Sequence, residues 1–317
     1  MGDEASPRRL AFLDACRALA VLAMLFANMM NVFLRRVPEA LQHNEGDILR
    51  AFDFPAAVFQ FLVGVSLVLF LRKRTTGGIA PGSARFTAVW RFVLLAGLGM
   101  VLDSVGALTA KPKWGVLQTL GLGGVVATGV AELPDGAVAA LALGLLALFF
   151  RGAPSEVHHN PLAALAFAPL TLAGLLVGRG LEADAPRRRL VTRAAVVGLA
   201  ALGWAALATM AGVPFNKTVG TSSFVAIATA ASVALLLATV ALEGAGVGFP
   251  AWLLAVGGNA LTAWVLQYML VYYPAWLVFP AWPRLSLLPG MAAVLAALAA
   301  LSALTIALGR RGIRIPI

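Results

Sequence analysis

Apolar stretches of about 20 residues recur from one end of the chain to the other, and short segments rich in Gly, Pro, Lys and Arg separate them. A helix of this length crosses a hydrocarbon layer about 30 Å thick. Because lipid offers no partner for backbone N–H and C=O groups, each stretch must pair them internally, which favours helices. Hydrophobic residues make up 61% of the sequence and charged residues 12%, which excludes a soluble globular domain. We therefore expect an all-α polytopic membrane protein.

The spacing of these stretches predicts about ten transmembrane helices in one bundle, with residues 1–317 forming a single domain. The expected helices cover 10–33, 52–71, 86–108, 115–131, 136–150, 161–178, 191–212, 222–242, 251–271 and 285–308. The sequence 272–283, YYPAWLVFPAWP, is expected to be an aromatic interfacial segment and not a full crossing. Gly174 and Gly178 have the small-xxx-small spacing that usually marks close helix packing, so we assign them no chemistry.

The distribution of Lys and Arg predicts the orientation of the bundle. If the first helix enters from the cytoplasm, fourteen basic residues fall on the cytoplasmic side and eight on the other. Cytoplasmic loops carry an excess of Lys and Arg, so both termini are expected in the cytoplasm. The net charge of +10 comes mainly from these loops, so the expected partner is the lipid bilayer and not a nucleic acid. The single cysteine, Cys16, lies within the first apolar stretch and excludes a disulfide framework.

Polar side chains near the helix ends form two layers in this topology. The outer layer contains the candidates His43, Asp53, Asn216 and Lys217, with Asn28 and Gln118 deeper in their helices. The inner layer contains Asp14, Arg17 and the basic cluster Arg72, Lys73 and Arg74. Because imidazole titrates near neutrality, a histidine that precedes a carboxylate at the mouth of a membrane helix suggests chemistry at the outer face.

Each of these residues also has a purely structural interpretation. Asp14 and Arg17 are three residues apart on a helix, so they could form an ion pair at the cytoplasmic rim. The cluster at 72–74 could do no more than set the topology. His43 on its own could be a solvated loop residue. The neighbours His158 and His159 lack a third ligand nearby, so a surface loop is favoured over a metal site and no metal is expected.

Five short motifs follow one another along the chain. They are Leu13–Arg17 (LDACR) with Asn28, His43 with Asp53 ten residues later, Gly115–Gln118 (GVLQ), Pro214–Lys217 (PFNK) followed by TSSF at 221–224, and Gly258–Ala260 (GNA). In residues and in order, they resemble the heparan-alpha-glucosaminide N-acetyltransferase family of transmembrane acyltransferases and related bacterial membrane proteins. The chain departs from the family at Ala18, where glycine is usual, and at Thr119, where arginine is usual. The tryptophan, asparagine and glycine that usually follow the histidine are missing after His43.

The resemblance implies an enzyme that takes an acetyl or short acyl group from acetyl-CoA in the cytoplasm and delivers it to an extracytoplasmic sugar amine or hydroxyl. It implies that His43 is a general base or a transient acyl carrier and that Asp53 orients the imidazole. The binding residues that it implies are Asn28, Arg17, Gln118, Asn216, Lys217, Asn259, Arg72 and Arg74. The asparagines are candidate donors to the thioester oxygen or oxyanion. The arginines are candidate partners for the CoA phosphates.

Other functions remain open at this point. A transporter or flippase for a polar solute could use the same intramembrane Asn, Gln and Asp residues, although no inverted repeat or matching pair of broken helices favours it. A degenerate, non-catalytic relative is an alternative because of the altered residues after His43. The resemblance places the protein in a bacterial cytoplasmic (inner) membrane. The acceptor, the acyl chain length and the oligomeric state are left open, with a homodimer among the possibilities.

Overall fold

The computed structural model describes residues 10–43, 46–108, 114–157, 160–181, 187–279, 282 and 284–315. Within these residues the fold is all-helical, apart from an isolated backbone bridge between Leu34 and Leu285, and this confirms the expected class. The longer helices are α1 (Ala11–Phe33), α2 (Phe54–Thr76), α3 (Pro81–Ala107), α4 (Val116–Gly129), α5 (Asp135–Leu148), α7 (Ala168–Gly178), α8 (Arg188–Met210), α9 (Ser222–Gly244) and α12 (Leu287–Arg310). The shorter pieces are η1 (Glu39–Leu41), η2 (Ala51–Asp53), α6 (Pro161–Ala164), η3 (Leu165–Phe167), α10 (Ala251–Gly257), α11 (Ala260–Gln267), η4 (Tyr268–Tyr272) and η5 (Pro274–Val278).

Each of the ten ranges expected from the sequence corresponds to a helical segment. Among the described residues, eight segments are long and apolar enough to cross a membrane. The helices α4 and α5 are shorter, with 14 residues each. Together these segments make the chain a polytopic membrane protein, and the number of crossings stays a prediction.

The segment at 272–283 differs from the expectation. The helix that begins with α11 continues through η4 and η5 to Val278, seven residues beyond the expected end at 271. Proline lacks the N–H that an α-helix needs, and the wider π-helical turn accommodates Pro274. The rings of Tyr272 and Trp276 stack with their centroids 4.4 Å apart, which stabilises this turn. Residues 280, 281 and 283 lie outside the described part of the chain.

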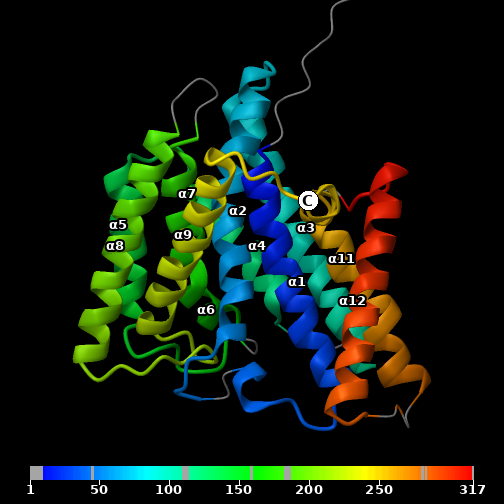
Figure 1. The fold of residues 1–317 in the computed structure, drawn as a ribbon. Coiled ribbons are helices and arrows are strands. Elements are labelled where there is room, and N and C mark those ends of the chain that lie inside the picture. Colours follow the sequence, from blue (N-terminus) through cyan, green and yellow to red (C-terminus); the bar gives the residue numbers. More distant parts are fainter. Residues whose placement is uncertain are drawn as a thin grey trace, which may run out of the picture.

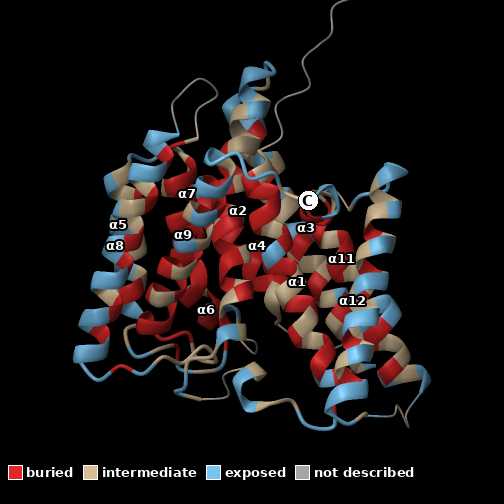
Figure 2. Ribbon diagram, in the orientation of Figure 1, coloured by how far each residue is buried: buried red, intermediate tan, exposed pale blue. Residues whose placement is uncertain are grey.

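The helices α2 and α7 lie toward the centre of the bundle, and α8 and α12 lie at its two sides (Figure 2). The central pair approaches so closely that glycine is required. A Cβ atom on Gly174 would lie 1.9 Å from the carbonyl oxygen of Phe61, and one on Gly64 would lie 2.0 Å from that of Thr171. The expected role of Gly174 in close helix packing is therefore confirmed.

The bundle has two ends that we name for the residues found there. At the terminal face, α1 begins and α12 ends (upper part of Figure 1). At the histidine face, the chain between α1 and α2 carries His43 (lower part of Figure 1). Both described ends of the chain therefore lie on one side of the bundle, and which side faces the cytoplasm stays a prediction.

Candidate functional site

His43 lies at the histidine face in a loop that one arginine holds in place. The guanidinium of Arg50 donates from Nη1 to Oε1 of Gln42 over 2.6 Å and to the carbonyl oxygen of His43 over 3.5 Å. Its Nη2 donates to Oε1 of Glu39 over 3.4 Å. His43 itself is half-buried. Because Arg50 directly precedes η2, the start of α2 and the position of His43 are fixed together.

Asp53 ends η2 and is completely buried. Its Oδ2 accepts a hydrogen bond of 2.9 Å from the backbone N–H of Arg50, and its Oδ1 lies 3.7 Å from Nζ of Lys217. Burying a carboxylate is costly unless a cation accompanies it, and Lys217 supplies that cation from the loop between α8 and α9. Burial lowers the pKa of the Lys217 ammonium below its ordinary value of 10.5, while the nearby Asp53 acts in the opposite direction.

Asn216 joins the two loops that carry His43 and Lys217. Its Nδ2 donates to Oδ1 of Asp47 over 2.9 Å, and its Oδ1 accepts from the backbone N–H of Val219 over 3.2 Å. The amide is thus engaged by the protein on both sides, as expected of a group that fastens loops. His158 and His159 lie outside the described residues.

A cavity of about 280 Å³, the histidine cavity, brings three of the predicted site residues together. Its lining residues are Met24, Asn28, His43, Phe52, Ala56, Val116, Lys217, Thr218 and Trp264. The amide of Asn28 donates to Oε1 of Gln267 over 3.4 Å, which sets its orientation from α11. An imidazole, an ammonium and an amide therefore face a small space with largely apolar walls.

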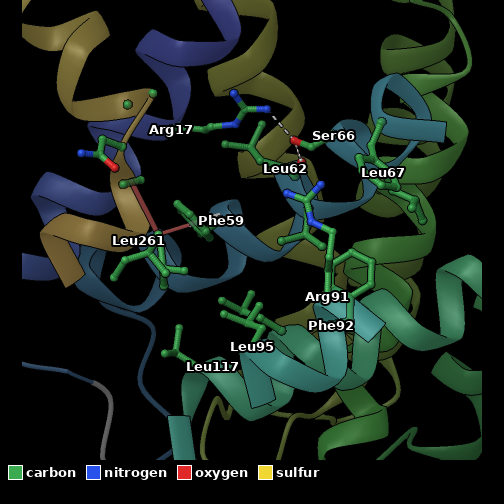
Figure 3. A pocket seen from close by; sticks show the side chains of 18 of the residues that line it. Arg17, Phe59, Leu62, Ser66, Leu67, Arg91, Phe92, Leu95, Leu117 and Leu261 are labelled. Carbon is green, nitrogen blue, oxygen red and sulfur yellow. Dashed lines mark hydrogen bonds between the residues drawn. The ribbon is translucent and has the colours of Figure 1, made fainter. Parts of the chain in front are cut away.

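A second cavity of about 470 Å³, the arginine cavity, lies between α1, α2, α3, α4 and the junction of α10 with α11 (Figure 3). Among the described residues, its lining includes three arginines: Arg17, Arg91 and Arg314. Arg17 donates to Oδ1 of Asp14 over 2.9 Å and to Oγ of Ser66 over 2.7 Å. The other walls are mainly apolar. Of these three guanidinium groups, only that of Arg17 forms an ion pair with a carboxylate of the described residues, so the cavity suits an anionic ligand with an apolar portion.

The two cavities follow one another along the same helices. On each of three helices, one residue lines the histidine cavity and a nearby residue lines the arginine cavity. These pairs are, in that order, Ala56 and Phe59 on α2, Val116 and Leu117 on α4, and Trp264 and Leu261 on α11. All six of these side chains belong to one hydrophobic cluster. A layer of apolar side chains thus separates the cationic cavity from His43.

The buried side chain of Gln118 links α4 to α3. Its Nε2 donates to Oδ2 of Asp103 over 3.0 Å, and the hydroxyl of Tyr268 donates to Oδ1 of the same carboxylate over 3.0 Å. A Cβ atom on Gly99 would lie 2.5 Å from Oε1 of Gln118, so α3 can approach the amide only at a glycine. Gln118 lines neither cavity, and its role in binding stays a prediction.

Asn259 lines the arginine cavity, but its side chain is engaged elsewhere. Its Nδ2 donates to the carbonyl oxygens of Thr305 over 3.3 Å and of Ile313 over 3.4 Å. Its Oδ1 accepts from the hydroxyl of Thr262 over 2.6 Å. An amide nitrogen has two protons to donate, and both are used by the backbone.

The two arginines expected at the end of α2 differ in their placement. Arg72 donates to the carbonyl oxygens of Leu181 and Arg179, so it ties α2 to the end of α7. Arg74 lies over the ring of Phe70 at 5.4 Å from its centroid, and Phe70 lines the arginine cavity. Arg74 is therefore near this cavity, whereas Arg72 serves the packing of the bundle.

Sequence reasoning missed the two further arginines of the cavity. Arg91 lies inside α3, 4.5 Å from the centroid of the Phe70 ring. An ionisable residue within an apolar helix marks a functional candidate by default, and this signal could have found it. Arg314 follows α12, where a basic residue indicates the orientation of the bundle and gives no signal of a binding site.

Comparison with known families supports the family resemblance that the motifs suggested. The family model described as "Heparan-alpha-glucosaminide N-acetyltransferase, catalytic" matches residues 9–175, from α1 into α7. The matched part contains Arg17, His43 and Asp53, and Lys217 and Asn259 lie beyond it. A comparison with curated proteins finds no match. The match covers more than half of the 317 residues, and the apolar helices agree with a membrane enzyme. The chain therefore belongs to the heparan-alpha-glucosaminide N-acetyltransferase family and is an integral membrane acyltransferase.

Proposed function

We propose that the protein transfers an acetyl or short acyl group from acetyl-CoA in the arginine cavity to a sugar amine or hydroxyl that reaches the histidine cavity. The observation that carries this proposal is the succession of the two cavities along the same helices, with guanidinium groups in one and His43 in the other. The phosphates of CoA need cations, and its pantetheine arm is long, thin and uncharged. Only that arm has to pass the apolar layer for the thioester to approach His43.

His43 can act in two ways, and both require a neutral imidazole. As a general base, it takes the proton of the acceptor amine or hydroxyl while the acceptor attacks the thioester carbon. The C–S bond then breaks, and the CoA thiolate recovers the proton from the imidazolium. As an acyl carrier, the imidazole nitrogen attacks the thioester first and the C–S bond breaks. The acceptor then takes the acyl group from the imidazole, and the acceptor's proton passes to the CoA thiolate, so that the imidazole is neutral again.

Other residues of the histidine cavity would stabilise the charge that develops. The ammonium of Lys217 and the amide of Asn28 face the same space as His43 and can donate to the carbonyl oxygen of the thioester. Asp53 keeps the ammonium in place at 3.7 Å. In this proposal Asp53 acts through Lys217, in addition to the orienting role toward His43 that the motif implies.

The proposal also assigns the two faces. Acetyl-CoA is a cytoplasmic metabolite that is too polar to cross lipid, so the terminal face, nearest to the arginines, is the cytoplasmic one. The acceptor is then an extracytoplasmic sugar or glycan at the histidine face. The excess of Lys and Arg in the loops of the terminal face supports this orientation.

The test uses purified protein, acetyl-CoA labelled in the acetyl group, and a panel of amino sugars and neutral sugars. His43→Ala should reduce acetyl transfer by about 100-fold or more while CoA binding stays unchanged. His159→Ala, a histidine substitution outside the described residues, is the matched control. Equal transfer by His43→Ala and wild type would refute the role of His43. Solute flux into liposomes without turnover of acetyl-CoA would refute the acyltransferase proposal in favour of a transporter.

Acid quenching during turnover separates the two roles of His43. Label that stays on wild-type protein and is absent from His43→Ala indicates an acyl carrier. Transfer without labelled protein at any time indicates a general base.

A further inference from the structure

The residues that follow α12 fold back over the arginine cavity. The structure describes this segment as far as Ile315, and Arg314 and Ile315 line the cavity. Two hydrogen bonds fasten the segment on either side of Arg314. The carbonyl oxygen of Ile313 accepts from Nδ2 of Asn259 over 3.4 Å, and the backbone N–H of Ile315 donates to Oγ1 of Thr262 over 3.2 Å.

The fastening residues form a connected and buried group. The hydroxyl of Thr262 accepts from Ile315 and donates to Oδ1 of Asn259 over 2.6 Å. Both side chains are buried, with 4% of Thr262 and 6% of Asn259 exposed. A buried polar group whose partners are all provided fixes a single arrangement. Asn259 therefore holds the segment in one position over the cavity.

The break between α10 and α11 places Asn259 where it can do this. Gly257 ends α10 against α1, where a Cβ atom would lie 1.9 Å from the carbonyl oxygen of Asp14. The chain leaves the helix at Gly258 and Asn259 and enters it again at Ala260. The side chain of Asn259 thereby reaches α12 and the segment after it, in addition to lining the cavity.

Arg314 differs from the other two arginines of the cavity in its surroundings. Arg17 is paired with Asp14, and Arg91 lies over the ring of Phe70. Within the part of the chain that the structure describes, no carboxylate forms an ion pair with Arg314, and this residue is exposed. A guanidinium held at the lining of a cationic cavity is suited to bind phosphate in two-pronged geometry.

We propose that the segment Ile313–Ile315 is a strap that forms part of the acyl-donor site, and that Arg314 binds a phosphate group of the donor nucleotide. Asn259 and Thr262 are positioning residues, because they act on the donor through the strap. This inference rests on the proposed function. It gives Asn259 a role different from the oxyanion donor that the motif suggests.

The test measures CoA binding to the purified full-length protein by calorimetry. Arg314→Gln should weaken CoA binding by about tenfold or more, as expected for the loss of a charge-assisted contact. Arg311→Gln is the matched control, because it removes the same charge three residues earlier from an exposed position that lines neither cavity. Its affinity should stay within about twofold of wild type. Dephospho-CoA, which lacks the 3′-phosphate, shows which phosphate Arg314 binds. If Arg314→Gln and Arg311→Gln bind CoA alike, the inference is wrong.

A double-mutant cycle tests the positioning role of Asn259. Asn259→Ala should weaken CoA binding in wild type and have little further effect in Arg314→Gln, because the strap then has no charge to position. Equal effects of Asn259→Ala in both backgrounds would contradict this role. Helix content and elution from a sizing column show whether each variant is folded. Wild-type protein that binds no CoA would refute the proposed function itself, whereas failure of the strap alone leaves wild-type binding intact.

Discussion

Replacing Gly174 with alanine tests how closely α2 and α7 must approach. The new Cβ atom would lie 1.9 Å from the carbonyl oxygen of Phe61, and real Cβ atoms do not come closer than 3.0 Å to such an atom. Both contact groups belong to helix backbones, so the helices must part by about 1.1 Å. A gap of 0.5–1 Å already forfeits roughly a quarter to a half of the dispersion energy of each contact across it. We expect a cost at the upper end of the range for overpacking, about 3 kcal/mol.

Gly144 provides the matched control. It lies within α5, and a Cβ atom there would meet nothing within 4 Å. Gly144→Ala should leave the free energy of unfolding unchanged or raise it by up to about 1 kcal/mol, because alanine loses less backbone freedom in a helix. Unfolding can be measured in mixed micelles by titration with a denaturing detergent, with helix content as the signal. A Gly174→Ala variant within about 0.5 kcal/mol of Gly144→Ala would refute the reasoning.

The double variant Gly64→Ala, Gly174→Ala sharpens the test. Once the first methyl group has parted the helices, the second finds part of the space it needs. The combined cost should therefore fall short of the sum of the single costs by about 1 kcal/mol. Additive costs would show that the two positions do not share one interface.

Three further predictions concern the histidine face. Lys217→Met leaves the buried Asp53 carboxylate without this cation and should lower the free energy of unfolding by about 3–5 kcal/mol, and adding Asp53→Asn should restore most of it; no recovery in the double variant contradicts the pairing. Because burial lowers the folded-state pKa of Lys217, the unfolded chain binds more protons in the alkaline window up to its ordinary pKa. The free energy of unfolding of wild type should therefore rise with pH in that window relative to Lys217→Met, and a flat difference would contradict the shift. Arg50→Gln releases the loop of His43 and should lower the turnover number about tenfold, equivalent to about 1.4 kcal/mol of lost positioning. The affinity for CoA should stay unchanged. Equal losses of turnover and of CoA affinity would contradict a specific role of Arg50 and indicate general misfolding.

The helices of this protein could be predicted because their signal is local. An apolar stretch of about 20 residues specifies a membrane helix without reference to the rest of the chain. The end of the helix at 251–271 was misplaced because a π-helical turn around Pro274 depends on stacking between Tyr272 and Trp276. That contact is not visible in hydropathy.

The candidate site was predictable only in part. The step from His43 to Asp53 is short and places both at the mouth of α2, so the motif indicated them together. The pairing of Asp53 with Lys217 joins residues from distant loops, and only the packing of α2 against α9 brings them to 3.7 Å. The amide of Asn259 likewise bonds to residues 46 and 54 positions later. The sequence identified these residues as polar candidates near helix ends or breaks, but the partners that decide their roles required the fold.

The arginine cavity takes its walls from both ends of the chain, with Arg17 on α1 and Arg314 after α12. A ribosome that adds about 5–20 residues per second needs roughly 10–40 s to proceed from the end of α4 to the strap. During this time the early helices are already in the membrane, and the cavity still lacks one wall. A nascent chain therefore lacks a complete arginine cavity until synthesis has passed Arg314, and the function proposed for that cavity is available only afterwards.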